Sequence, residues 1–160
     1  MTSDERLEAR VGALLKAKGW TIGAAESCTG GLVLHRLTNI PGSSDYVLGG
    51  VVAYSNTIKQ ALLNVQEATL AAHGAVSEQT AAEMATGARK ALGVDVAVSI
   101  TGIAGPGGGT PQKPVGLTYI GLAGRDNLLL VRRHVWPGDR EAVKSASAEA
   151  ALQLVLEVLG

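Results

Sequence analysis

The sequence contains no phenylalanine and only two Trp and three Tyr residues among its 160 positions. Surfaces that bind single-stranded nucleic acid usually stack the bases on several aromatic side chains, which this composition does not offer. The formal net charge is zero, so the chain also lacks the excess of Lys and Arg that neutralises nucleic-acid phosphates. We therefore expect no nucleic-acid partner.

Cysteine is equally scarce, since Cys28 is the only one in the sequence. A single cysteine excludes an internal disulfide framework and any zinc site built from several thiolates. His35, His73 and His134 are scattered, without the spacing of metal ligands. No apolar run reaches the roughly 18 residues of a membrane-spanning helix, and no signal peptide precedes the charged start. We expect a cytoplasmic protein with no metal, no organic cofactor and no membrane partner.

Helical patterns alternate with short apolar runs over most of the chain. Helical spacing predicts helices at 3–18 (with Ser3 as its cap), 29–38, 56–65, 67–72, 77–93 and 138–159. Apolar runs predict strands at 20–26, 46–55 and 94–102, and the segments 115–124 and 127–136 predict a β-hairpin. This alternation predicts one α/β domain over residues 1–160, a three-layer α/β/α sandwich with a mixed, mostly parallel sheet.

Three of the predicted strands end in unusual sequences, AESCTGG, AYSNTIK and SITGIAGPGGGT. In open α/β sheets, ligands bind outside the carboxyl ends of the strands. We therefore expect these three segments to converge on one crevice.

The first of these segments places Ser27, Cys28 and Thr29 directly before Gly30 and Gly31. Backbone N–H groups are unpaired where a helix begins, and they can hold an oxyanion or a phosphate. The same residues could equally serve only to cap the helix and pack it closely against the sheet. Cys28 is a further candidate nucleophile, although a lone cysteine beside an apolar segment usually behaves as a small buried hydrophobic residue.

The second segment contributes Tyr54 and Lys59. Lys59 falls on the first turn of a predicted helix, where the helix dipole would lower its pKa, and burial would lower it further. A lysine that is neutral near pH 7 can act as a general base for a serine. The alternatives are a solvated surface lysine and a tyrosine that only packs, whereas a functional Tyr54 could relay a proton.

The third segment is a Gly-rich loop after a buried strand, and Thr101, Gly102 and Gly105 lie at its start. It is neither a Walker A loop nor a dinucleotide fingerprint, because Thr110 stands where the last glycine should be and no helix follows. A loop of this length in a small domain is usually functional. Near the last helix, Arg140 could bind a phosphate or carboxylate in a bidentate manner, or it could form a surface salt bridge.

Taken in order, AESCTGGLV, VVAYSNTIKQALLNV, HGAVSEQTAAEMA, SITGIAGPGGGTPQKPVG and PGDRE resemble the CinA C-terminal domain, the nicotinamide-nucleotide amidase family. The resemblance covers roughly residues 5 to 158 and suggests the stand-alone form of the family. It implies hydrolysis of the carboxamide of nicotinamide mononucleotide (NMN) to nicotinate mononucleotide and ammonia, in bacterial pyridine-nucleotide salvage.

The resemblance also implies roles for individual residues. Ser27 would be the nucleophile, Lys59 the base and Tyr54 a helper or orienting group. Substrate contacts would come from Cys28, Thr29, Gly30, Gly31, Thr101, Gly102, Gly105 and Arg140. The family further implies a small nucleotide substrate, no cofactor, and a homodimer or higher homo-oligomer.

Two other functions fit the same residues. In a non-catalytic nucleotide-binding module, Ser27 would be a helix cap and Lys59 would pair with a phosphate, so the pKa of Lys59 would be normal or raised. An interaction protein linked to competence or DNA damage would instead present a large exposed apolar patch.

Overall fold

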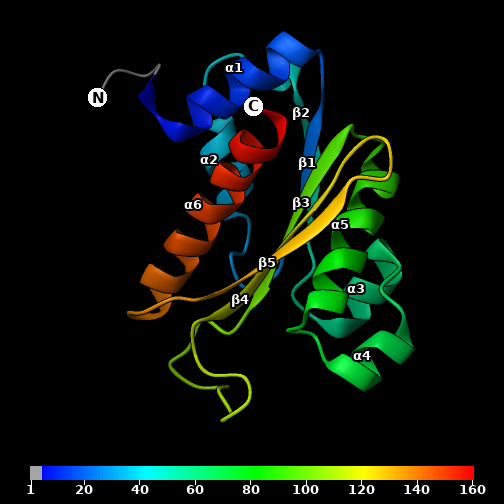
Figure 1. The fold of residues 1–160 in the computed structure, drawn as a ribbon, viewed down its shortest axis with the longest axis vertical. Coiled ribbons are helices and arrows are strands. Elements are labelled where there is room, and N and C mark those ends of the chain that lie inside the picture. The colour runs from blue at the N-terminus through cyan, green and yellow to red at the C-terminus, as the bar shows by residue number, and fades with distance from the viewer. Residues whose placement is uncertain (1–4) are drawn as a thin grey trace.

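A five-stranded sheet in the order β2-β1-β3-β4-β5 forms the centre of the structure, a computed structural model that describes residues 5–160 (Figure 1). The strands are β1 (Ile22–Glu26), β2 (Val47–Val52), β3 (Val96–Gly102), β4 (Leu117–Ala123) and β5 (Leu129–Val135). β1 pairs in parallel with β2 and β3, whereas β4 is antiparallel to both β3 and β5. Only β4 runs against the other strands, which confirms a mixed, mostly parallel sheet.

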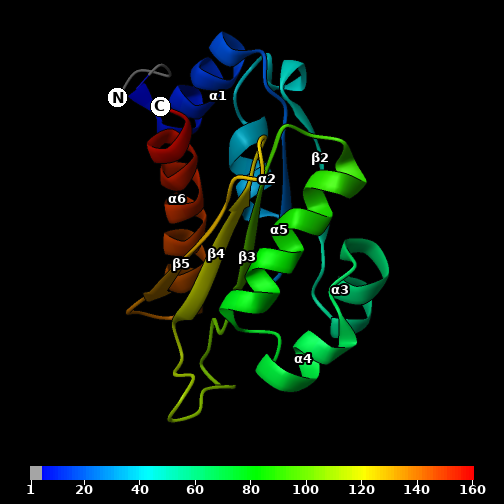
Figure 2. The same cartoon turned by 45° about the vertical axis from the view of Figure 1, so that its right-hand side comes forward.

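Helices cover both faces of this sheet (Figures 1 and 2). One face carries α1 (Leu7–Lys18), α2 (Leu32–Thr38) and α6 (Arg140–Leu159), and the other carries α3 (Asn56–Leu63), α4 (Glu67–His73) and α5 (Glu78–Leu92). A short 3₁₀ turn at Ser43–Asp45 precedes β2. The predicted three-layer sandwich is therefore confirmed. Among residues 5–160, none of the helices combines the length and apolar character needed to cross a membrane.

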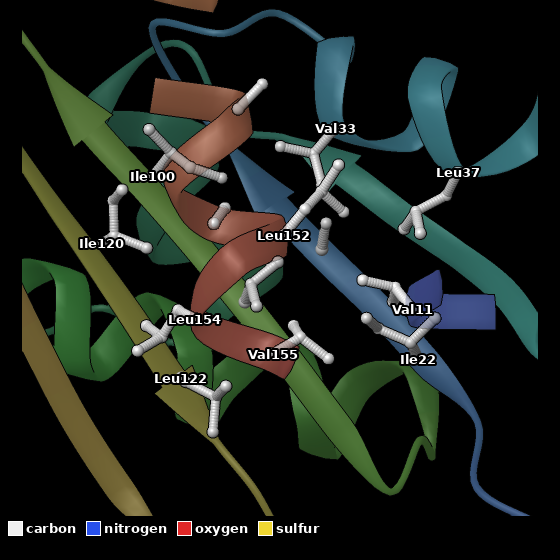
Figure 3. Close-up of a cluster of buried hydrophobic side chains, with 14 of the residues drawn as sticks. Val11, Ile22, Val33, Leu37, Ile100, Ile120, Leu122, Leu152, Leu154 and Val155 are labelled. Carbon is white, nitrogen blue, oxygen red and sulfur yellow. The ribbon is translucent and has the colours of Figure 1, made fainter. Parts of the chain in front are cut away.

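The larger part of the core lies between the sheet and the helices α1, α2 and α6 (Figure 3). Ile22, Ile100 and Ile120 come from three adjacent strands and face Leu152 and Val155 of α6. A second cluster packs under α5 on the opposite face. Because β1 and β3 are covered on both faces, their sequences read as continuous apolar runs rather than as an alternating pattern.

Three predicted helix starts lie two or more residues away from those in the structure. The first helix begins at Leu7, and the predicted cap Ser3 lies outside the described residues. The second begins at Leu32 instead of Thr29, with Gly31 in the capping position at a φ of 109° that favours glycine. The helix predicted from residue 138 begins at Arg140.

The strand order reverses at β1. The chain reaches β2 from β1 through α2 on one face, and it returns past β1 to β3 through α5 on the other face. Such a switch point opens a crevice at the carboxyl ends of the strands. The three segments that follow β1, β2 and β3 meet there, at the lower end of the sheet in Figure 1, where the loop 103–116 projects.

Candidate active site

Ser27 is the first residue after β1, and the neighbouring strands fix the backbone around it. Its N–H donates to the carbonyl of Ile100 on β3 at 3.0 Å, while the N–H of Ala53 after β2 donates to the carbonyl of Glu26 at 2.8 Å. Ser27 is 8% exposed and lines a cavity. The end of β1 therefore presents this hydroxyl from a rigid support.

Lys59 lies directly beside this hydroxyl, with its Nζ 3.1 Å from Ser27 Oγ. Helix α3 carries Lys59 on its first turn, and the helix is capped by Ser55, whose hydroxyl accepts from the N–H of Ile58 at 3.2 Å. The lysine is only 1% exposed. In the part of the chain that the structure describes, no carboxylate forms an ion pair with it.

Burial lowers the pKa of Lys59 from its ordinary value, in the direction that the sequence predicts. Its Nζ donates to the carbonyl oxygens of Ala53 at 2.9 Å and Tyr54 at 3.3 Å. A neutral amine has two N–H bonds and one lone pair. With both N–H bonds used on these carbonyls, the lone pair remains for the O–H of Ser27, as a general base requires.

The fully buried carboxylate of Glu26 occupies the N-terminal end of α2. Its Oε1 accepts from the N–H groups of Gly31 at 3.1 Å and Val33 at 3.0 Å, and its Oε2 accepts from Leu34 at 3.1 Å. Sequence reasoning missed this role. The signal was a charged residue at the end of the apolar run IGAAE, because a buried carboxylate must find hydrogen-bond donors.

This arrangement leaves only part of the turn from Cys28 to Gly31 free for a ligand. Neither Ser27 nor Thr29 caps α2 with its side chain. The N–H of Gly30 donates to the carbonyl of Ser27 at 3.1 Å, and that of Gly31 is used by the Glu26 carboxylate. Within residues 5–160, the N–H groups of Cys28 and Thr29 have no such partner. These two remain as candidate oxyanion donors.

Cys28 is buried, with 6% of the residue exposed, and it lines the cavity together with Gly102. Burial raises its pKa to about 11, so the reactive thiolate hardly forms near neutral pH. A Cβ on Gly102 would come 3.2 Å from Cys28 Sγ and 2.8 Å from Thr118 Oγ1, so this close approach requires glycine. The environment favours Ser27 over Cys28 as the nucleophile.

The cavity has a volume of about 280 Å³. It brings together most of the predicted site residues: Ser27, Cys28, Tyr54, Lys59, Thr101, Gly102, Gly105 and Arg140. Thr29, Gly30 and Gly31 line a neighbouring cavity instead.

Seven residues in the cavity wall were not among the predicted site residues: Asn56, Ala75, Val76, Ile103, Ala104, Gly107 and Gly108. The hydroxyl of Thr101 donates to the carbonyl of Ala75 at 2.7 Å, so Thr101 shapes the wall by holding the segment between α4 and α5. Asn56 could have been noticed as a polar neighbour of Lys59, but nothing in the sequence links Ala75 or Val76 to the site.

Arg140 connects three segments at the mouth of the cavity. Its guanidinium donates to the carbonyl of Gly105 at 2.7 Å and to the hydroxyl of Tyr54 at 2.9 Å. Tyr54, which is 61% exposed, thus contacts Lys59 through its carbonyl and Arg140 through its hydroxyl. No ion pair joins Arg140 to a carboxylate of the described residues. Of the two alternatives that the sequence left open for Arg140, the surface salt bridge is not formed within residues 5–160, and the cation remains available to an anionic ligand.

No group of three or more His, Cys, Asp and Glu side chains that could hold a metal ion occurs between residues 5 and 160. The chemistry of the cavity rests on a hydroxyl, an amine, backbone N–H groups and a guanidinium.

The sequence profile described as "CinA C-terminal domain" matches residues 4–159. The chain belongs to the CinA C-terminal domain family. Among its relatives, a CinA-like protein of Chloroherpeton thalassium is 53% identical over 161 residues, which cover 99% of this chain and 38% of that protein. The chain therefore spans little more than a third of the length of that relative. The nicotinamide-nucleotide amidohydrolase PncC of Enterobacter agglomerans is 51% identical over 150 residues, covering 94% of this chain and 92% of that protein.

Solved structures of the CinA family have the same fold. The crystal structure of the competence/damage inducible protein CihA from Agrobacterium tumefaciens matches with a TM-score of 0.92 at 40% identity, covering 96% of this chain and 93% of that one. A CinA superfamily protein from Klebsiella pneumoniae matches with a TM-score of 0.92 at 37% identity, covering 96% and 95%.

Proposed function

We propose that this chain is a nicotinamide-nucleotide amidase, which hydrolyses the carboxamide of NMN to nicotinate mononucleotide and ammonia in pyridine-nucleotide salvage. The observation that carries the proposal is the buried contact of 3.1 Å between Lys59 Nζ and Ser27 Oγ in the cavity wall. The nicotinamide-nucleotide amidohydrolase of Enterobacter agglomerans, a relative of nearly the same length, supports the choice of substrate.

In the first step, Ser27 Oγ attacks the carboxamide carbon while Lys59 Nζ takes the hydroxyl proton. The carbonyl oxygen of the substrate becomes an oxyanion, and the N–H groups of Cys28 and Thr29 are the donors left for it. Losing one such donor typically lowers the rate by ~10²–10³-fold.

In the second step, the protonated Lys59 gives its proton to the substrate nitrogen, the C–N bond breaks and ammonia leaves. The carbonyl oxygens of Ala53 and Tyr54 accept hydrogen bonds from the Lys59 ammonium group and hold it in place during this transfer. A water molecule then attacks the ester on Ser27 and gives a proton to Lys59, which returns it to Ser27 Oγ. The products are nicotinate mononucleotide and free enzyme.

The position of Arg140 favours an anionic substrate. Its guanidinium lies at the mouth of the cavity, and no carboxylate of residues 5–160 forms an ion pair with it. The cavity volume of about 280 Å³ falls at the small end of typical ligand sites of ~300–1,000 Å³. The cavity suits the reacting end of a nucleotide better than the whole molecule.

The test is ammonia release from NMN by the purified chain in the presence of EDTA, beside Ser27→Ala and Lys59→Met. We expect turnover in the wild type, a loss on the order of 10⁶-fold in Ser27→Ala and a loss of roughly 10²–10⁴-fold in Lys59→Met. Circular dichroism would show that both variants fold, and Lys90→Ala on the exposed side of α5 serves as the charge-loss control. Binding of NMN without any turnover would instead favour a non-catalytic nucleotide-binding module.

A further inference from the structure

A second cavity, of about 520 Å³, adjoins the candidate active site along the same turn and the same helix. Ser27 and Cys28 line the first cavity, and residues 29–32 line the second. On α6, Arg140 lines the first and Glu141 the second. The two cavities are thus lined by consecutive residues of one turn and one helix, and we call the second cavity the α6 groove.

Lys144 places a positive charge in the α6 groove. A Cβ added to Gly30 would come 3.8 Å from its Nζ, so the ammonium lies over the turn that follows Ser27. Burial is the main reason that the pKa of the Cys28 thiol is raised. The positive charge of Lys144 lowers this pKa, and its effect is larger than that of Lys59. Lys144 thus lies close to the turn that carries Ser27 and Cys28.

This lysine has no partner of its own among residues 5–160: no ion pair and no hydrogen bond joins its Nζ to another side chain or to a carbonyl. Within the described chain, Glu141 is the one carboxylate that lines the groove, and it forms no ion pair with Lys144 although the two residues are three apart on α6. The negative charge of Glu141 weakens the attraction of the groove for anions. Removing this charge should therefore strengthen anion binding, whereas removing the charge of Lys144 should weaken it.

Thr29 supplies an independent sign that the wall of the groove is incomplete without a ligand. The residue is 2% exposed and lines the groove, but its hydroxyl finds no hydrogen-bond partner in the described chain. Buried hydroxyl groups are normally paired, and an unpaired one has a free-energy cost. His35 and Ser145 add further polar groups to the same groove.

The usual place for a phosphate in such folds, the N-terminus of the helix after β1, is closed in this protein. The Glu26 carboxylate already takes the N–H groups of Gly31, Val33 and Leu34 there, so a phosphate in the adjoining groove needs a side-chain cation in their place. Arg140 lines the first cavity rather than the groove, and its guanidinium donates to Gly105 and Tyr54 there.

We propose that the α6 groove holds the phosphate group of the substrate, a phosphate monoester, with Lys144 as its cationic contact. The identity of the substrate rests on the proposed amidase function, whereas the anion site itself does not. Lys144 then distinguishes a nucleotide from the corresponding nucleoside, because only the nucleotide reaches the groove with a charged group.

The direct test is calorimetric titration of the chain with inorganic phosphate at constant ionic strength. Binding is expected in the wild type, in Lys144→Arg and in the control Lys90→Ala, whose lysine lies on the opposite face of the sheet. Affinity should fall by roughly 10- to 100-fold in Lys144→Ala, as expected for loss of a hydrogen bond to a charged group, and it should rise in Glu141→Gln. Equal binding by the wild type and Lys144→Ala would overturn the proposal.

Kinetics test the same site with the substrate. For NMN, Lys144→Ala should raise KM by roughly 10- to 100-fold with little change in kcat, and Lys144→Arg should restore it. For nicotinamide riboside, which lacks the phosphate, wild type and Lys144→Ala should have the same kcat/KM. An unchanged KM for NMN in Lys144→Ala overturns the phosphate site. A wild type without any amidase activity would refute the proposed function, and the phosphate titration would still decide the site.

Discussion

Lys59 Nζ lies 3.1 Å from Ser27 Oγ although the two residues are 32 positions apart in the sequence. The parallel pairing of β1 with β2 brings them together, because the register places Glu26 opposite Val52 and so sets Ala53 beside Ser27. The chain then turns into α3, whose first turn carries Lys59 back toward β1. The contact is thus a property of the sheet register as much as of the two side chains.

We expect the amidase rate to rise with pH through the lowered pKa of Lys59, because only the neutral amine can accept the proton of Ser27. Burial lowers this pKa, so the rise should be centred below the pH near 10.4 at which an ordinary lysine titrates. The measurement is kcat/KM for NMN as a function of pH. A rising limb centred near pH 10.4 would show that Lys59 is not the base, or that it is not buried in solution.

The buried lysine should also make stability depend on pH. Between the lowered pKa of the folded state and about 10.4, the unfolded chain binds a proton at Lys59 that the folded chain does not. The free energy of unfolding therefore rises with pH in this window, by at most about 1.4 kcal/mol per pH unit.

Lys59→Met lacks the cost of burying a charged lysine. Its free energy of unfolding should therefore exceed that of the wild type by the largest amount at pH values below this window. Its advantage should shrink as the pH approaches 10. Urea unfolding of both proteins at several pH values measures the difference, and a difference independent of pH would contradict the assignment.

The sequence was sufficient to predict the three layers, the mixed sheet and the meeting of the three strand ends, because apolar runs and helical spacing are local patterns. It could not reveal the role of Glu26, whose partners are backbone N–H groups that carry no side-chain signature. The last helix buries Ser147 together with Val143 and Leu154, although a serine gives no apolar signal in the sequence. That helix contacts α1, α2 and the sheet together, so its buried surface is wider than one stripe.

Glu26→Gln should destabilise the protein by about 1–3 kcal/mol, because one of the two carboxylate oxygens becomes an NH₂ group facing a buried N–H donor. Activity should fall too, since the turn that carries the candidate oxyanion donors loses part of its support. Urea unfolding and NMN turnover measure the two effects. Glu157→Gln is the matched control, because the ion pair of Glu157 with Arg132 is exposed and should contribute less than about 1 kcal/mol. Equal stabilities of the two variants would refute the role of Glu26.

Arg140→Lys should loosen the Gly-rich loop, because a single ammonium cannot reproduce the guanidinium contacts to Gly105 and Tyr54. Hydrogen exchange of residues 103–116 should become faster, while exchange in the core strand β3 should not change. Tyr54→Phe removes one of the two contacts and should have a smaller effect. Unchanged exchange in both variants would show that Arg140 does not hold the loop.

Cys28→Ala should retain amidase activity within about 10-fold, because the substitution keeps the backbone N–H and removes only a thiol that burial keeps protonated. If Cys28 were the nucleophile, the loss would instead be on the order of 10⁶-fold. The same burial predicts slow reaction of the wild-type thiol with iodoacetamide at neutral pH, and the rate should rise about tenfold per pH unit toward the pKa of about 11. Rapid labelling at pH 7 would show that the thiol is accessible and ionised, which would reopen the choice between Cys28 and Ser27.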